Sequence, residues 1–117
     1  MAEPDPIIVE YRGRDIFVGG SKAFTSDLPI RNVAAMEDRL IVLLEVDPKL
    51  CFNQNVLAID ASGRELWTIQ ERKWPNENSP YVMLLVTDDD LWAINWSGYT
   101  VRVSLESGRI LETVFTK

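Results

Sequence analysis

Side chains that could act as nucleophiles, bases or soft metal ligands are scarce in this sequence. Cys51 is the single cysteine, and the 117 residues include no histidine. A His-based catalytic triad, a histidine zinc site and a Cys–His nucleophile pair are therefore excluded. One cysteine cannot close an internal disulfide, which favours a reducing compartment. We expect Cys51 to be a buried or half-buried structural thiol.

Carboxylates are the abundant reactive groups, with 18 Asp and Glu residues, and Asp88-Asp89-Asp90 is their densest cluster. Hard cations bind carboxylates, but this cluster lacks the spaced Asp-x-Asp-x-Asp-Gly pattern of a calcium loop. Hydrolysis of a glycosidic bond needs two carboxylates at one site, and no feature of the sequence fixes two of them together. Gly19-Gly20 lacks the spacing of a phosphate-binding loop. The sequence therefore predicts no catalytic residue, no cofactor and no metal site.

The tryptophans are more informative, because four are many for a chain of this length. Alternation places Trp92, Ile94 and Trp96 on one side of a strand and Leu91, Ala93 and Asn95 on the other. The favoured interpretation makes the Trp92–Trp96 side part of the core. In the alternative, Trp92 and Trp96 point outward and form an aromatic patch with Trp74, whose polar, Pro-rich loop makes burial hard to explain. Since aromatic residues are enriched at protein interfaces, Trp74, Trp92 and Trp96 are the candidate protein-contact residues.

Apolar residues recur with a period of two along the chain, which predicts an all-β fold. Short turns separate about ten strands in an antiparallel meander, predicted at 7–11, 14–18, 30–36, 39–46, 55–60, 64–69, 81–87, 90–96, 99–105 and 109–116. Residues 19–29 are predicted to be a loop with at most one helical turn at 26–29. The strand at 39–46 is apolar on both faces, which predicts a central position in its sheet. The polar loop 73–80 is the candidate boundary between two halves.

Two stretches of the sequence are similar to each other. RLIVLLEV and NVLAIDASGRELWTI lie within 39–69, and DLWAINWSGYTVRVSLESGRILETV spans 90–114. In both, a strand ends in a Ser-Gly-Arg turn, at residues 62–64 and 107–109, and an apolar strand follows. A short hairpin turn needs a residue at positive φ, which glycine adopts without steric cost.

The repeat resembles the blades of quinoprotein-like (PQQ-type) β-propellers and, more loosely, of WD-repeat propellers. In that family a "VYALD" strand leads through an "xTG" turn to an "ELW" strand, and residues 56–60, 61–63 and 65–67 are similar to it. The second copy departs from the pattern, since 101–105 lacks the Ala-Leu-Asp ending. The family's cofactor and substrate sites lie at the centre of a complete ring, so no site residue carries over to a chain this short.

The resemblance implies a single all-β domain over 1–117, with two blade-like units at about 30–70 and 81–117 after an N-terminal hairpin. Two architectures are open. The sheets close on themselves as a small sandwich or flattened barrel, which we slightly favour, or several chains associate to complete a partial propeller.

The net charge of −6 argues against nucleic acid or an anionic membrane as a partner. The charge either keeps the protein soluble or attracts a partner protein with a basic surface. Met1–Pro6 shows no signal peptide, and the longest apolar run, at 40–44, is too short to span a bilayer. We therefore expect a cytoplasmic protein.

Three functions fit these observations. The first, which we favour, is a non-enzymatic module that binds another protein or itself as a homo-oligomer. The second is a small acidic immunity-type inhibitor of a basic toxin. The third is a small-ligand carrier or enzyme with a site between sheets, for which Asp60, Glu65, Asn95 and Tyr99 are the candidates.

Overall fold

In the computed structural model, which describes residues 8–115, strands that follow each other in the chain pair to form three antiparallel sheets. The first sheet holds β1 (Val9–Arg12), β2 (Asp15–Val18) and β3 (Ser21–Thr25). The middle sheet holds β4 (Ile30–Met36), β5 (Arg39–Leu44), β6 (Val56–Asp60) and β7 (Glu65–Thr68). The last sheet holds β8 (Tyr81–Thr87), β9 (Asp90–Asn95), β10 (Tyr99–Val103) and β11 (Ile110–Phe115). The predicted all-β meander is confirmed.

The structure differs from the predicted strands mainly near the N-terminus. Residues predicted to form a loop contain β3, which returns from the Gly19-Gly20 turn to pair with β2. The Ser-Lys-Ala-Phe-Thr segment lacks clean alternation, so its strand depends on this pairing and on the packing of Phe24 against the core. No helical turn forms at 26–29, whereas a 3₁₀ turn, η1, forms at Pro48–Leu50. Residue 7 of the first predicted strand, residue 116 of the last and the Met1–Pro6 segment lie outside the described residues.

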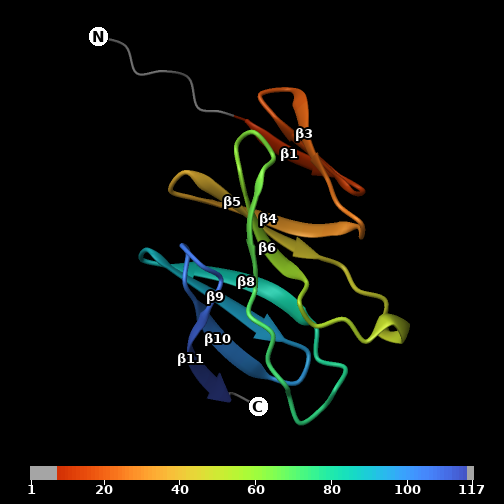
Figure 1. Ribbon diagram of the computed structural model, residues 1–117, viewed down its shortest axis with the longest axis vertical. Coiled ribbons are helices and arrows are strands. Elements are labelled where there is room, and N and C mark those ends of the chain that lie inside the picture. Colours follow the sequence, from red (N-terminus) through yellow and green to blue (C-terminus); the bar gives the residue numbers. More distant parts are fainter. Residues whose placement is uncertain (1–7, 116–117) are drawn as a thin grey trace.

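The three sheets are stacked along the 52 Å axis of the molecule, with the middle sheet between the other two (Figure 1). Strands β5 and β6 are buried on both faces, which confirms the central position predicted for 39–46. One face meets the first sheet in a cluster of buried residues, Ile16, Ile30, Leu40, Val42, Leu44, Leu57 and Ile59. The opposite face, with Ile41, Leu43, Val56 and Ala58, meets Leu91, Ala93, Val101 and Val103 of the last sheet. Each large apolar side chain buried in this way contributes about 1.5–3 kcal/mol to folding.

The two Ser-Gly-Arg turns are contact points between successive sheets. Gly63 has a φ of 90°, and a Cβ placed on it would lie 1.7 Å from the carbonyl oxygen of Ala23 on β3. Gly108 has a φ of 75°, and its Cβ would lie 2.5 Å from the ring of Trp67 on β7. Each turn therefore packs against the last strand of the preceding sheet, so these glycines meet a steric requirement in addition to the predicted turn conformation.

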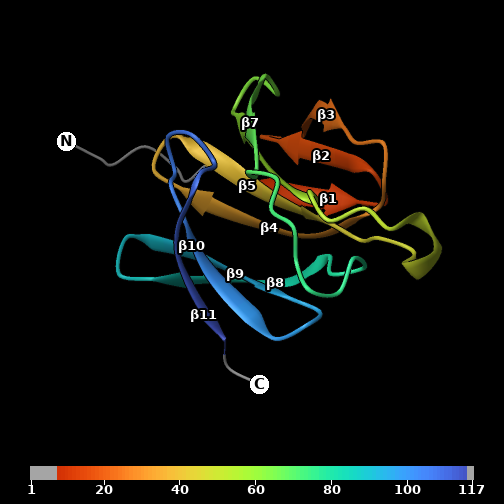
Figure 2. The same cartoon turned by 60° about the horizontal axis from the view of Figure 1, so that its bottom comes forward.

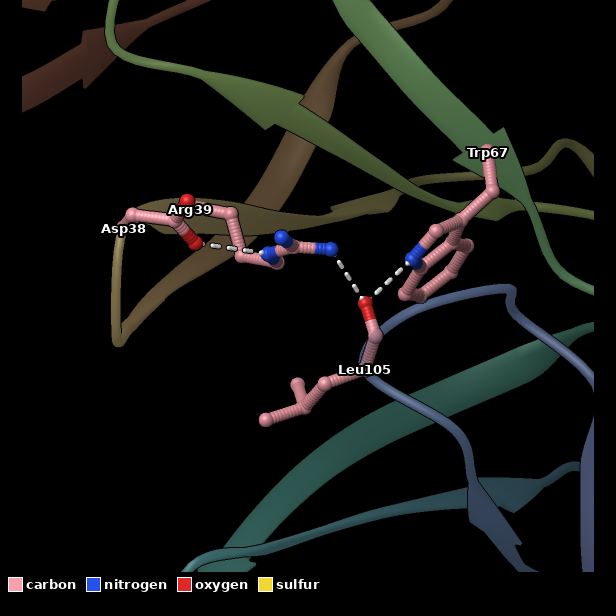
Figure 3. Close-up of polar contacts among 4 residues, drawn as sticks. All are labelled: Asp38, Arg39, Trp67 and Leu105. Atoms are coloured by element: carbon pink, nitrogen blue, oxygen red, sulfur yellow. Dashed lines mark hydrogen bonds and ion pairs between the residues drawn. The ribbon is translucent and has the colours of Figure 1, made fainter.

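A backbone carbonyl in the turn after β10 links the last sheet to the middle sheet. The oxygen of Leu105 accepts a hydrogen bond from Arg39 Nη1 at 2.6 Å and another from Trp67 Nε1 at 2.7 Å (Figure 3). Arg39 also donates from Nε to Asp38 Oδ1 at 3.0 Å, which lowers the pKa of the Asp38 carboxyl. Because the Trp67 ring is buried, its indole N–H needs this partner inside the protein.

The side chain of Asn55 is a second link between the same two sheets. Asn55 is fully buried; its Nδ2 donates to the carbonyl oxygens of Leu44 and Tyr81, both at 2.8 Å. Its Oδ1 accepts a hydrogen bond from the backbone N–H of Tyr81 at 2.9 Å. The amide thus binds both backbone polar groups of the first residue of β8, an edge strand of the last sheet, and so links the two sheets.

Replacing Gly63 with alanine is expected to destabilise the fold by at least about 3 kcal/mol. The change combines a left-handed backbone, which costs about 1–2 kcal/mol, with a clash against rigid backbone on β3. Gly13→Ala is the matched control, since Gly13 has a φ of 58° with nothing within 4 Å of the added Cβ. We expect it to cost only about 1–2 kcal/mol in urea denaturation. Equal losses in the two variants would contradict a close contact between the sheets at Gly63.

Asn55→Leu is expected to lower the free energy of unfolding by about 2–4 kcal/mol, because it leaves the backbone groups of Tyr81 buried without partners. Asn32→Ala serves as the control. The side chain of Asn32 is exposed and accepts from the adjacent N–H of Val33, so its loss should cost less than about 1 kcal/mol. Chemical denaturation of both variants measures the difference. If Asn55→Leu lowers the free energy of unfolding no more than Asn32→Ala does, the Asn55 amide does not link the two sheets.

Candidate protein-binding face

The register of the last sheet separates its side chains into two faces. Residues opposite each other in antiparallel strands point to the same side. Leu91, Ala93, Val101 and Val103 point to the middle sheet and are buried. The residues that alternate with them point away from the middle sheet, and we call this set the outer face: Met83, Leu85, Trp92, Ile94, Thr100, Arg102, Glu112 and Val114.

The outer face is largely apolar, and much of it is open to solvent. Exposed fractions are 53% for Met83, 45% for Leu85 and 40% for Val114, and Trp92 and Ile94 are half-buried between their neighbours. No strand of the described residues packs against this face, which lies at one end of the stack (Figure 2). Several exposed apolar side chains on one sheet face are typical of an interaction site.

Three polar groups on this face have partners within the sheet. The Trp92 indole Nε1 donates to Thr87 Oγ1 at 3.0 Å. Arg102 Nε lies 3.5 Å from Glu112 Oε1, so neighbouring strands carry a neutral ion pair. A partner could therefore cover the face without leaving these three groups unpaired, which removes a main cost of burial.

The structure corrects the assignment of the two sides of β9. Leu91, Ala93 and Asn95 form the buried side, so the favoured interpretation, in which Trp92, Ile94 and Trp96 belong to the core, is wrong. Both sides of β9 are largely apolar, and only the sheet that packs against one of them decides which is buried. Trp92 lies on the outer face, and Trp96, just beyond β9, is 70% exposed.

Trp74 lies apart from this surface, since it is only 7% exposed. Its ring stands edge-on to Tyr81 at 6.5 Å and lies 4.8 Å from Tyr99, with the Arg72 guanidinium 5.1 Å from its centre. Burial raises the pKa of Tyr81 to about 12, against the opposing effect of Arg72, so its hydroxyl stays neutral. The expectation that burial of Trp74 would be hard to explain is therefore corrected: its polar loop folds back so that the ring completes the core.

The part of the loop that follows Trp74 approaches the exposed tryptophan instead. Pro75 and Asn76 line a shallow hollow of about 310 Å³ together with Trp96, Tyr99 and Phe115. Of the three candidate contact tryptophans, Trp96 is exposed, Trp92 is half-buried on the outer face and Trp74 is buried in the core.

Cys51 is exposed, in contrast to the buried or half-buried thiol that we expected. It ends the 3₁₀ turn η1 in a left-handed conformation, with a φ of 48°, on a surface loop between β5 and β6. The sequence around it, Pro-Lys-Leu-Cys-Phe, contains enough apolar residues to suggest burial, but Leu50 and Phe52 are exposed as well.

Two of the four candidate residues for a ligand or catalytic site, Asp60 and Asn95, bind the backbone of their own turns. Asp60 Oδ1 accepts from the N–H groups of Ser62 and Arg64 and from the Ser62 hydroxyl in its own turn, and the hydroxyl is the main reason that its pKa is lowered. Asn95 is buried and accepts from the N–H groups of Ser97 and Tyr99. Both side chains shape turns, which accounts for them without a ligand.

Within residues 8–115, no group of three or more Cys, Asp or Glu side chains is arranged to hold a metal ion. Asp88-Asp89-Asp90 occupies the turn between β8 and β9, where Asp88 has a φ of 46°. The same part of the chain contains no helix of the length and apolarity needed to cross a membrane.

The stacked sheets are similar to two solved structures. A computationally designed protein, Ika8, matches 99% of this chain with a TM-score of 0.67 and 11% identity, and the chain covers 36% of Ika8. BamB from Moraxella catarrhalis, a PQQ-like β-propeller protein, matches 94% of this chain with a TM-score of 0.57 and 14% identity. The chain covers 35% of BamB. These likenesses define the fold as propeller-like.

Residues 7–115 match the model of a family described as a domain of unknown function, DUF7957, and the chain belongs to that family. No curated protein matches the chain.

Leu85→Lys is expected to leave the fold intact, because the side chain lies on the open outer face and a lysine there remains in water. We expect a change of less than about 0.5 kcal/mol in the free energy of unfolding of dilute protein. Val101→Lys is the matched control on the inner side of the same sheet, fully buried, and should cost more than about 3 kcal/mol. Similar losses from both changes would mean that the outer face is covered within the chain itself.

Proposed function

We propose that this protein is a non-enzymatic β module that binds another protein, or itself, through the outer face of its last sheet. The observation that carries the proposal is the exposure of Met83, Leu85 and Val114 on one sheet face with no described strand against it. Apolar side chains in such a patch lose contact with water when a partner covers them, which favours association.

The proposal treats β4–β7 and β8–β11 as two quinoprotein-like blades of a partial propeller. Three features support this interpretation: the strands follow the same order in both sheets, each carries a Ser-Gly-Arg turn before its last strand, and the turn glycine packs against the preceding sheet. Among the described residues, no strand lies against the outer face of the β8–β11 blade. The open side of this sheet supports a binding role for it.

The charge distribution separates this surface from the acidic remainder of the chain. The net charge is −6, yet the Arg102–Glu112 pair is the main charged feature within the outer face. The partner surface should therefore be apolar at its centre, with no need for a strongly basic patch. Trp92, which lies on the face itself, is of the residue type most often found at binding hot spots.

As part of the same proposal we assign the protein to the cytoplasm. Cys51 is an exposed free thiol, and in an oxidising compartment such a thiol tends to form disulfides between molecules. A reducing compartment keeps it in the state that the structure describes.

Photocrosslinking in the cells that express the protein tests the binding role directly. A photoreactive amino acid at position 85 should give a discrete covalent adduct to a protein, because this position would be covered in the complex. The same residue at position 22, an exposed lysine at the opposite end of the stack, is the control and should give none. A lack of any adduct at position 85, in a variant that folds normally, would contradict the proposed function.

A further inference from the structure

We propose that the occupant of the outer face is the outer face of a second copy of this chain, related to the first by a two-fold axis. This inference rests on the proposed function and names its partner. It follows from a comparison of the two ends of the stack, from the composition of the outer face and from the way in which the sheets already pack within the chain.

The opposite end of the stack is built to face water. In the register of the first sheet, the side chains that point away from the middle sheet include Glu10, Arg12, Asp15 and Lys22. Phe17 points the same way, and the Arg12 guanidinium covers its ring at 4.7 Å from the ring centre. A head-to-tail contact between copies would place these charges against Met83, Leu85 and Ile94. Burying charges without partners is costly, so chains of copies and rings built in this way are disfavoured.

A two-fold contact avoids that mismatch because it pairs the outer face with itself. The half formed by β8 and β9 is apolar, with Met83, Leu85, Trp92 and Ile94. The half formed by β10 and β11 carries Thr100, Arg102, Glu112 and Val114, whose two charges are paired. A two-fold axis can place the apolar half of one copy on the apolar half of the other, and the paired charges then lie toward the rim.

The resulting contact has the geometry that the chain already uses twice. The middle sheet packs face to face on both neighbours through Ile, Leu and Val side chains. Two outer faces would pack in the same way, about 10 Å apart. One four-stranded face is roughly 20 Å square, below the typical area for a tight dimer, so we expect a dissociation constant of about 1–100 µM.

The net charge gives this dimer a characteristic salt dependence. Two chains of charge −6 repel each other, while the contact itself is apolar. Added salt screens the repulsion, so the dimer should become tighter between low and moderate ionic strength. A complex driven by attraction to a basic partner would weaken under the same change.

Light scattering of the full chain over a dilution series from about 1 µM to 1 mM tests the inference, since the range brackets the expected dissociation constant. The mass should rise with concentration from between one and one and a half times that of one chain, 13.3 kDa, toward twice that value. Leu85→Lys should weaken the dimer at least tenfold, and Met83→Lys should act in the same way. Val86→Lys is the matched control, because Val86 is the next residue on β8, is 46% exposed against 45% for Leu85, and points to the other side of the sheet.

Loss of the dimer in Leu85→Lys and its retention in Val86→Lys would establish the two-fold contact. Three results would overturn it: a strict monomer at all concentrations, an oligomer that grows beyond two chains, or a dimer that Leu85→Lys leaves unchanged. If the purified chain is monomeric but position 85 crosslinks to a different protein in cells, the inference that the partner is a second copy is wrong, while the proposed function stands. If neither association is found, both fail.

Discussion

The middle sheet has two apolar faces, and the rest of the structure depends on covering both. Strands β5 and β6 have almost no exposed side-chain surface, with Ile41, Val42 and Ile59 all at 0%. A sheet with one polar face could stand at the surface of the molecule, but this one requires another sheet on each side. The stack of three is the smallest arrangement that meets this requirement.

The contacts between sheets are specific as well as apolar. Gly63 and Gly108 allow each Ser-Gly-Arg turn to approach the last strand of the preceding sheet, and a side chain at either position would prevent it. Asn55 and the carbonyl oxygen of Leu105 then pair polar groups that stacking would otherwise bury alone. Apolar packing supplies most of the stabilisation, while these contacts restrict how one sheet can slide or rotate on the next.

In a stack of three sheets, each end sheet has one face that no other sheet of the stack covers. These two faces differ in composition. The first sheet ends the stack with charged side chains and with Phe17 shielded by Arg12. The last sheet ends it with Met83, Leu85 and their neighbours on the outer face. This asymmetry gives the molecule one end suited to water and one end suited to a partner, which is the physical basis of the function proposed for it.

The sequence by itself determined the β class, ten of the eleven strands within a few residues, and the glycine turns, because alternation and turn chemistry act over short distances. Those local signals could not find β3, which depends on pairing with β2, or the burial of Trp74, which depends on where its loop folds back. They also could not choose between the two apolar sides of β9 or predict that Cys51 is exposed. Only the tertiary structure decided these points, since burial is a property of which surfaces meet, and residues far apart in the chain bring those surfaces together.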